Sequence, residues 1–456
     1  MLRQSTHACI LGKSATVAEA VLQWVRHNPN GHILTAAPSN DAADVLLAKL
    51  SNHLGPSEMT RILSIRRIDH IPDSLLDYVH LNTSEYRQTK QRIMESRVTV
   101  ATVNTAARFS FYGIDRGFFD TIIVDEAGHA TEPEVIAVAS TLLDFDGGGG
   151  LVLAGDPKQL GPVVMNKECQ RLGLDMSYME RLTRYSMFKK QKSTGEFFPG
   201  LVTMLRRNYR SHESIIRLPN EMFYDGDLTC QADPATSHNL CQWAQLPRAG
   251  FPVFFHAITG ENLREESSPS WFNPQEASLC AEYAQSLIAG EGLHSEDIGI
   301  IAPYTAQVSK IRQTLTDLGL GGIKVGSVET FQGQERRAII MSTVRSERER
   351  VTNDIRYNLG FVANSKRFNV SLTRAKSLLI VVGCPDVLSL DKKNWLPLLR
   401  YCHEHGAWKG QDWDPTLERS NPTAKTAGPA DQVLAVYREQ DVEEEFAEEP
   451  ICAAGA

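Results

Sequence analysis

The stretch Thr121–Glu126 constrains the fold of this chain more than any other. It places Ile-Ile-Val directly before two acids, Asp125 and Glu126. This pattern is typical of a buried parallel strand, and open α/β sheets bind their ligands at the carboxyl ends of strands. Adjacent carboxylates there suit nucleotide hydrolysis, with Asp125 holding Mg²⁺ and Glu126 deprotonating the attacking water. The alternative is a strand that ends in a solvated acidic turn, which is common in proteins.

The tripeptide Gly12-Lys13-Ser14 matches the second half of a phosphate-binding loop. Residues 15–25 follow it, and their apolar positions share one face of a helix. At the start of a helix, Lys13 would reach the β- and γ-phosphates of a nucleotide and Ser14 would bind Mg²⁺. A complete loop has another glycine five residues before Gly12, where this chain has His7. Glycines let main-chain N–H groups turn toward a phosphate, so the sequence predicts a loop that is only half present.

Short apolar runs alternate with helical segments along most of the chain, which predicts the fold class α/β with two parallel-sheet domains. The expected strands are residues 32–37, 98–102, 121–124, 151–154, 253–257, 298–302, 338–343 and 378–382. We expect domain 1 at 1–165, a helical connector at 166–200, domain 2 at 201–405 and a disordered acidic tail at 406–456. The strand before the phosphate loop is expected to be absent or confined to residues 6–11. Its loss would leave the first domain incomplete at its N-terminus and expose two strand edges.

The negative charge of the chain is concentrated near its C-terminus. The chain has a net charge of −8, and residues 431–456 contribute eight acids and one arginine, a net of −7. The remaining residues therefore carry a net charge of −1. A nearly neutral body can still present a basic groove, so the net charge does not exclude a nucleic-acid partner.

The cysteines and the hydropathy indicate the cellular setting. Eight cysteines occur singly, with no Cys-x-x-Cys pair, which favours a reducing, cytoplasmic compartment. The segment 402–405 (Cys-His-Glu-His) has no second cluster, so a solvated helix end is favoured over a metal site.

No apolar run approaches the ~18 residues of a membrane span, and the N-terminus lacks the apolar run of a secretory signal. We expect a monomer that does not associate with membranes.

Five stretches together carry a family resemblance. They are residues 123–127 (IVDEA), 153–162 (LAGDPKQLGP), 205–212 (LRRNYRSH), 325–335 (VGSVETFQGQE) and 366–376 (KRFNVSLTRAK). In this order they resemble the motifs of superfamily 1 helicases of the nonsense-mediated-decay type, which are P-loop NTPases. Residues 268–274 and 358–361 are similar to the Moloney leukaemia virus ten branch, the Armitage-like RNA helicases of RNA silencing. The resemblance covers residues 12–405.

The resemblance implies two RecA-like domains that bind ATP and Mg²⁺ between them, with single-stranded RNA across their top. It implies that Ser14 and Asp125 bind the metal, that Gly12 and Lys13 bind phosphate, and that Glu126 is the catalytic base. It also implies that Gln159 senses the γ-phosphate and that Arg210 and Arg374 are arginine fingers from the second lobe. Tyr209 would pack on the nucleotide base, and Gly333 and Glu335 would lie near the γ-phosphate or the ribose. Bidentate guanidinium groups suit the charge that develops on a transferred phosphoryl group.

The implied RNA contacts lie at strand ends. They are Pro38, Ser39, Asn40, Thr102, Pro303, Tyr304 and Thr330. Short polar side chains there suit contacts to phosphates and 2′-hydroxyls, which position RNA without reading its sequence. The alternative is that these are ordinary turn and helix-cap residues.

Two departures from the family pattern leave two functions open. The family has a loop rich in glycine and proline where this chain has residues 7–11. Because the resemblance begins only at residue 12, we expect the N-terminal accessory domains of the family to be absent. The first hypothesis is an ATP-dependent 5′-to-3′ RNA helicase of RNA silencing or RNA turnover, with silencing proteins as partners. The second is an ATPase-deficient RNA-binding scaffold on a helicase fold. A DNA helicase is disfavoured only by the branch-level resemblance.

Overall fold

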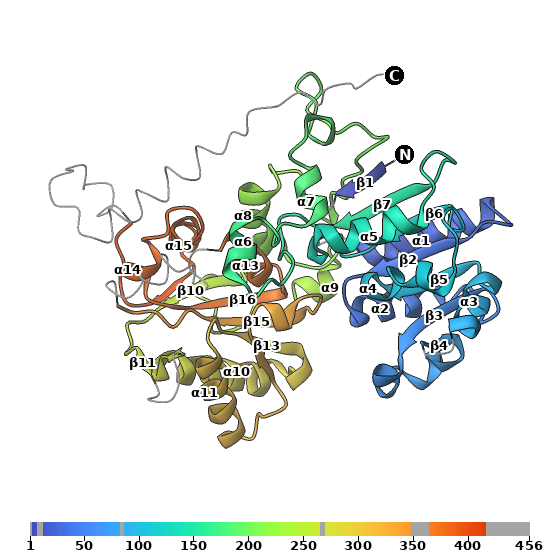
Figure 1. Ribbon diagram of the computed structural model, residues 1–456. Helices are drawn as coiled ribbons and strands as arrows, with labels where there is room; N and C mark the ends of the chain where they lie inside the picture. The colour runs from blue at the N-terminus through green and yellow to red at the C-terminus, as the bar shows by residue number, and fades with distance from the viewer. Residues whose placement is uncertain (1, 7–11, 83–85, 265–269, 348–363, 416–456) are drawn as a thin grey trace. The chain divides into compact units, whose positions relative to one another are not determined.

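The computed structural model describes residues 2–6, 12–82, 86–264, 270–347 and 364–415 (Figure 1). The loop at 7–11, the stretch 358–361 and the tail beyond 415 lie outside the described residues. The chain divides into two compact units. The first unit comprises Met1–Ser237 with Gln332–Glu335, and the second comprises His238–Phe331 with Arg336–Ala456.

The first unit is built on a seven-stranded sheet in which every strand pairing is parallel. In sheet order the strands are β1 (Leu2–Thr6), β7 (Gly150–Gly155), β6 (Thr121–Val124), β2 (Ile33–Ala37), β5 (Val98–Thr102), β3 (Met59–Ser64) and β4 (Val79–Asn82). The four strands predicted from apolar runs in this half of the chain, at 32–37, 98–102, 121–124 and 151–154, are confirmed. The predicted α/β class is therefore correct for this unit.

The prediction for the strand before the phosphate loop was wrong. Strand β1 lies at Leu2–Thr6, upstream of the predicted 6–11, and pairs with β7 from Leu2↔Leu151 to Thr6↔Gly155. It occupies the end of the sheet and covers the edge of β7 that we expected to be exposed (Figure 1). The sequence Leu-Arg-Gln-Ser-Thr contains no apolar run. A strand at a sheet edge does not need one, which explains why the pattern missed it.

Helices cover both faces of this sheet because successive strand residues point to opposite sides. Ile33 packs into one core with helices α1 (Lys13–His27) and α2 (Asn40–Leu50). The next residue, Leu34, packs into the other core with α5 (Glu132–Leu142). These two apolar cores fix the sheet between helical layers and leave its strand ends available for polar residues.

The remainder of the first unit contains short helices and a small sheet. They are α3 (Tyr86–Glu95), α4 (Val103–Ala106), α6 (Lys167–Arg171), α7 (Tyr178–Leu182), α8 (Glu213–Phe223), α9 (Pro234–Ser237), and the pair β8 (Arg207–Asn208) and β9 (Thr229–Cys230). The sequence assigned residues from 201 onward to the second domain, whereas the structure groups 201–237 with the first unit. Val202 lies in the core around α5, and the Tyr224 hydroxyl donates to Asp156 at 2.9 Å, which ties this segment to β7.

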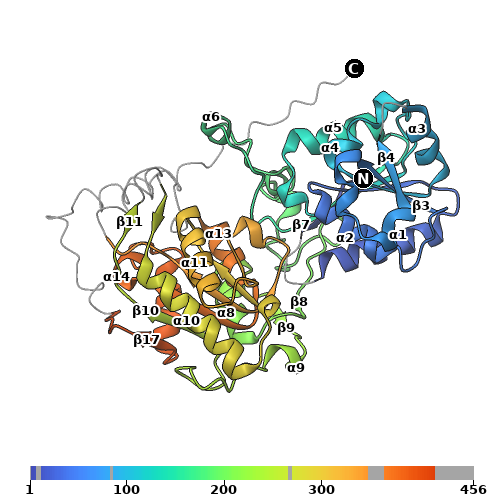
Figure 2. The ribbon, with the colours of Figure 1, turned by 90° about the horizontal axis from the view of Figure 1, so that it is seen from below.

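The second unit contains a six-stranded sheet that is also parallel throughout. In sheet order its strands are β14 (Lys324–Gly326), β13 (Ile298–Ile301), β15 (Arg336–Ser342), β16 (Ala375–Gly383), β10 (Val253–Ala257) and β17 (Trp408–Gly410). Its main helices are α10 (Pro274–Glu291), α11 (Thr305–Asp317), α13 (Ser365–Leu372) and α15 (Trp395–Glu404). Helices α10 and α11 lie side by side (Figures 1 and 2). Both predicted α/β sheets are therefore present.

Two predictions for this unit need correction. The sequence of residues 368–376 predicts a helix, but α13 ends at Leu372 and β16 already begins at Ala375. Disorder was expected from residue 406, but β17 pairs with β10 and Trp408 stacks on Phe255 with ring centroids 4.8 Å apart. A strand of three residues in a polar stretch gives no period-two signal, so only its tertiary partners reveal it.

Candidate nucleotide site and nucleic-acid interface

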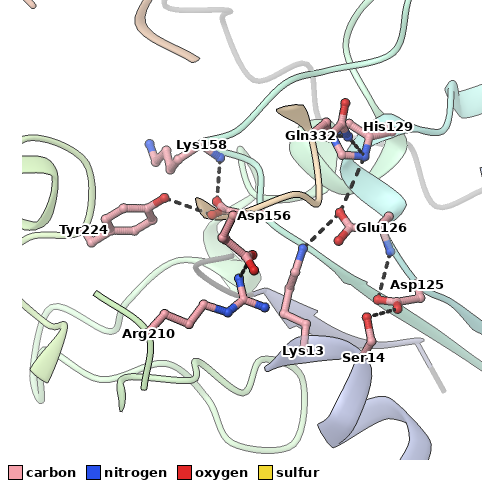
Figure 3. A network of polar contacts seen from close by, with 11 residues as sticks. Lys13, Ser14, Asp125, Glu126, His129, Asp156, Lys158, Arg210, Tyr224 and Gln332 are labelled. Carbon is pink, nitrogen blue, oxygen red and sulfur yellow. Dashed lines mark hydrogen bonds and ion pairs between the residues drawn. The ribbon is translucent and has the colours of Figure 1, made fainter. Parts of the chain in front are cut away.

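The two acids predicted from the sequence lie at the carboxyl end of β6. Asp125 is fully buried and its main-chain N–H donates to the Ala36 carbonyl at 2.8 Å, which continues the sheet ladder by one residue. Glu126 then adopts a left-handed backbone conformation with φ of 51°. Its N–H donates to Oδ1 of Asp125 at 3.0 Å. The turn therefore begins directly after Asp125 and separates the directions of the two carboxylates (Figure 3).

The start of helix α1 meets both carboxylates. Gly12 caps the helix in a left-handed conformation with φ of 65°, which glycine adopts without steric cost. The Lys13 ammonium lies 3.1 Å from Oε2 of Glu126, and the Ser14 hydroxyl donates to Oδ2 of Asp125 at 2.8 Å (Figure 3). The structure thus joins residues that are more than 100 positions apart in sequence. This arrangement can bind a phosphate at the helix N-terminus and a cation at the carboxylate.

Burial shapes the electrostatics of the quartet formed by Lys13, Ser14, Asp125 and Glu126. Burial, together with the neighbouring Glu126 carboxylate, raises the pKa of Asp125 to about 6, while Lys13 and the Ser14 hydroxyl oppose the rise. A buried carboxylate of this kind gains much from a bound cation, because the cation restores the ionised form. Lys13 is also buried, with 4 % of its surface exposed. Its ammonium is compensated by Glu126.

Sequence reasoning missed His129, which lies one helical turn after Glu126. Its Nδ1 is 3.5 Å from Oε2 of Glu126, and the Gln332 amide nitrogen lies 2.6 Å from the same ring nitrogen (Figure 3). Gln332 comes from the short segment Gln332–Glu335 that belongs to the first unit. Glu126 therefore has a lysine and a histidine next to its carboxylate. The spacing of three residues between the acid and the imidazole was the available signal in the sequence.

The carboxyl end of β7 contributes two buried polar residues. Asp156 accepts hydrogen bonds from the Lys158 N–H and from the Tyr224 hydroxyl, each at 2.9 Å. Gln159, the predicted γ-phosphate sensor, is 2 % exposed, and its Nε2 has no hydrogen-bond partner among the described residues. A buried amide nitrogen without a partner calls for an explanation, and a ligand oxygen would supply one.

The segment around Tyr209 and Arg210 is held by a side-chain turn. Oδ1 of Asn208 accepts from the Arg210 N–H at 2.7 Å and from the Ser211 N–H at 3.0 Å. The Arg210 guanidinium forms an ion pair with Glu335. We predicted that Arg210 would come from the second lobe, but the structure groups it with the first unit.

Three further residues were predicted to bind the nucleotide: Tyr209, Gly333 and Arg374. Tyr209 is 55 % exposed, which leaves its ring available for a base. Gly333 has φ of 69°, in the left-handed region that favours glycine. Arg374 lies in the second unit, almost fully buried, and its Nε donates to the Val370 carbonyl at 3.3 Å.

The described residues fit a nucleotide with Mg²⁺. A buried carboxylate with a serine hydroxyl, a buried lysine, a helix N-terminus and an unpartnered buried amide are the groups that such a ligand requires. In the part of the chain that the structure describes, no three His, Cys, Asp or Glu side chains are grouped so that they could hold a metal ion. Mg²⁺ at Asp125 would therefore depend on phosphate and water for most of its ligands, as is usual for this ion.

The predicted RNA contacts of the first unit lie at the ends of neighbouring strands. Ala37 and Thr102 are paired at the ends of β2 and β5. Ser39 caps α2 by accepting from the Ala42 N–H at 3.2 Å, and Thr102 caps α4 through the Thr105 N–H at 3.2 Å. The cap role that the sequence left open is therefore present for both residues. Thr102 is buried, with 8 % of its surface exposed.

A buried arginine that sequence reasoning missed orients Asn40. Arg61 on β3 is fully buried and donates to Oδ1 of Asn40 and to Oδ1 of Asp44, each at 3.0 Å. Burial lowers the pKa of Arg61, and the ion pair with Asp44 opposes that change. In the second unit, the predicted contacts Pro303 and Tyr304 lie between β13 and α11. Thr330 follows β14, and its hydroxyl donates to the Ser327 carbonyl at 2.8 Å.

Comparison with known proteins agrees with the class that the fold and the site define. Two family profiles described as AAA domain match residues 78–167 and 183–386. With its two parallel α/β units and the quartet of Lys13, Ser14, Asp125 and Glu126, the chain has the fold of P-loop NTPases of the RecA-like helicase type.

Comparison with individual proteins gives the family. The chain is 42% identical over 418 residues to the Danio rerio protein named as helicase mov-10-B.1, covering 88% of this chain and 41% of that protein. It is 41% identical to the human RNA helicase Mov10l1 (89% and 34% covered) and 34% identical to the Drosophila melanogaster RNA helicase armi (88% and 36% covered). The chain belongs to this MOV-10 and Armitage-like family of superfamily 1 helicases. It spans 34–41% of the length of these relatives.

A more distant likeness concerns solved structures. A complex of the arterivirus helicase nonstructural protein 10 with DNA matches with a TM-score of 0.43 and 14% identity, covering 85% of this chain and 61% of that one. Within the described ranges, no helix combines the length and the apolar character needed to cross a membrane.

Proposed function

We propose that this protein is an ATP-dependent RNA helicase that acts on single-stranded and duplex RNA in RNA silencing or RNA turnover. The observation that carries the proposal is the quartet at the start of α1, where Lys13 faces Glu126 and Ser14 bonds to Asp125. Relatives of 41% and 34% identity named as RNA helicases support RNA as the substrate. We further propose a cytoplasmic monomer with silencing proteins as partners and movement from 5′ to 3′.

In this proposal each residue of the site has a separate task. Lys13 would leave Glu126 for the nucleotide phosphates, and Ser14 and Asp125 would hold Mg²⁺, which supplies charge stabilisation at the phosphates. Freed of the lysine, Glu126 would accept a proton from the attacking water, and the buried Gln159 amide would orient that water. Arg210 and Arg374 would act as arginine fingers that place positive charge at the phosphates. Tyr209 would pack on the nucleotide base, and Gly333 and Glu335 would contact the γ-phosphate or the ribose.

The RNA would lie along the strand ends. We propose that Pro38, Ser39, Asn40 and Thr102 of the first unit and Pro303, Tyr304 and Thr330 of the second contact the RNA backbone. Their polar atoms beyond the carboxyl ends of β2, β5, β13 and β14 are suited to phosphates and 2′-hydroxyls. Recognition of this kind does not depend on the nucleotide sequence of the RNA.

The test is RNA-stimulated ATP hydrolysis by the full chain beside a Glu126→Gln variant. A lost general base costs about 100-fold or more in turnover, so we expect the variant to lose almost all activity while RNA binding persists. Glu19→Gln on the exposed face of α1 is the matched control and should behave as wild type. Duplexes with a 5′ or a 3′ overhang then give the direction, and unwinding only of the 3′-tailed duplex would contradict the proposed polarity.

A second candidate function is an ATPase-deficient RNA-binding scaffold, and His7 in place of the loop glycine favours it. The same assay separates the two. Wild-type protein that binds RNA but hydrolyses no ATP above the Glu126→Gln background would establish the scaffold and reject the helicase.

A further inference from the structure

The short hairpin between β10 and α10 places an arginine beside a tryptophan. Strands β11 (Leu263–Arg264) and β12 (Trp271–Phe272) are antiparallel, with Arg264 directly opposite Trp271. The Arg264 guanidinium carbon lies 5.7 Å from the centre of the Trp271 ring. Arg264 is exposed and Trp271 is half-buried. The hairpin therefore carries an exposed cation over the ring of a half-buried tryptophan.

A second arginine holds Trp271 in place from the interior. Arg345 follows β15, is 2 % exposed, and has its guanidinium carbon 4.7 Å from the Trp271 ring and 5.1 Å from the Tyr304 ring. Its Nε donates to the Tyr304 hydroxyl at 3.0 Å. Cation–π contacts of a desolvated arginine are among the stronger contacts of this type. Arg345 thus links the hairpin to Tyr304, a residue that we propose to contact RNA.

The surrounding loops come from the carboxyl ends of the strands. Asn262, just before β11, accepts the Ser346 N–H at 3.0 Å, and the Ser270 hydroxyl accepts the Ala306 N–H of α11 at 3.0 Å. Loops after β10, β13 and β15 therefore meet at Trp271. Asn262 is 6 % exposed, and its Nδ2 has no partner among the described residues, so the cluster also holds an unused buried donor. Carboxyl ends of parallel strands are where such sheets bind ligands.

These groups match the chemistry of single-stranded nucleic acid. Proteins that bind single strands stack bases on aromatic rings and pair phosphates with arginine, without reading sequence. We propose that Trp271 stacks on a nucleobase of single-stranded RNA, that Arg264 pairs with an adjacent phosphate, and that Arg345 is a positioning residue for Trp271. This inference rests on the proposed RNA-binding function and adds a base-contacting point to contacts that otherwise involve the backbone.

The test compares two fluorescein-labelled twelve-nucleotide strands, oligouridine and an abasic ribose–phosphate strand, by fluorescence anisotropy with the full chain. Wild-type protein should bind oligouridine about tenfold more tightly than the abasic strand, the range of one stacked base. Trp271→Ala should lose this preference without weakening abasic binding, and Trp271→Phe should keep most of it. Tyr185→Ala is the matched control, because Tyr185 is also an exposed ring with an arginine, Arg181, at 5.8 Å.

An independent variant covers the case in which Trp271→Ala does not fold. Arg264→Gln changes an exposed side chain and should weaken both strands alike, lowering the slope of log affinity against log salt by about 0.7, the value for one phosphate on a single strand. Equal loss of both strands in Trp271→Ala, or an unchanged slope in Arg264→Gln, would overturn the inference while leaving RNA binding intact. If wild-type protein binds neither strand, the proposed function itself fails, and this inference fails with it.

Discussion

The environment of Glu126 shows how single residues set the properties of the candidate site. Its backbone is left-handed, and its carboxylate lies 3.1 Å from the Lys13 ammonium and 3.5 Å from the His129 ring. For a residue other than glycine this conformation costs about 1–2 kcal/mol. Strain of this kind persists where the surrounding structure over-determines it, often at functional sites. The turn that gives Glu126 its direction is therefore part of the site.

At this scale we expect Lys13 and Glu126 to be coupled in stability. Glu126→Gln leaves a buried ammonium without its carboxylate and should lower the free energy of unfolding by about 1–3 kcal/mol. Lys13→Met removes the charge, so the double variant should be more stable than the sum of the single effects predicts, by about 0.5–3 kcal/mol. Urea unfolding of the four proteins measures this coupling. Additivity within about 0.5 kcal/mol would show that the pair contributes nothing.

At the scale of elements, helix α10 fixes the end of strand β15 through one carboxylate. Oε2 of the fully buried Glu276 accepts from the Ser342 hydroxyl at 2.6 Å and from the N–H groups of Thr343 and Val344 at 2.9 and 2.8 Å. Val344 has φ of 73°, an unfavourable conformation for a β-branched residue. Glu276 therefore stabilises the turn that directs the next residue, Arg345, toward Trp271 and Tyr304.

This arrangement predicts a pH dependence of stability with a definite sign. Burial raises the pKa of Glu276 to about 7, although its hydrogen-bond donors oppose the rise. The unfolded chain releases this proton near pH 4.3, so the contribution of the group to stability is greatest below that pH and falls as pH rises toward 7. Relative to Glu276→Gln, wild-type protein should lose stability between pH 5 and pH 8, as measured by urea unfolding. A constant difference between the two proteins would contradict the raised pKa.

The same elements show how far the sequence could predict this molecule. Buried parallel strands such as β6 and β16 produce continuous apolar runs, so both sheets could be predicted. Strand β1 at the sheet edge and the three-residue β17 carry no such run. Lys13 and Glu126 could be assigned to one site because the family resemblance links the Gly12-Lys13-Ser14 tripeptide to the acidic strand, although the phosphate loop is only half present. Arg345 could not be placed against Trp271, since its partners come from loops that only the tertiary fold brings together.

At the scale of the whole molecule, charge is distributed unevenly along the chain. Of the net charge of −8, residues 431–456 contribute −7. The acids of this segment repel the phosphates of the RNA that we propose the chain binds, wherever the two come within about a Debye length of each other. The segment should therefore weaken RNA binding at low salt and have little effect at high salt.

We expect the affinity for single-stranded RNA to rise when the glutamates of this segment become glutamine. Replacing Glu443, Glu444, Glu445, Glu448 and Glu449 changes the net charge by five, from −8 to −3. The repulsion acts over a Debye length of about 10 Å at 0.1 M salt and about 3 Å at 1 M. Binding by anisotropy should thus be several-fold tighter than wild type at 50 mM salt and converge with it above 500 mM. A variant with the same residues in shuffled order keeps the charge and should match wild type. If the neutralised variant were tighter at every salt concentration, the segment would be occupying the RNA site by specific contacts and not by charge alone.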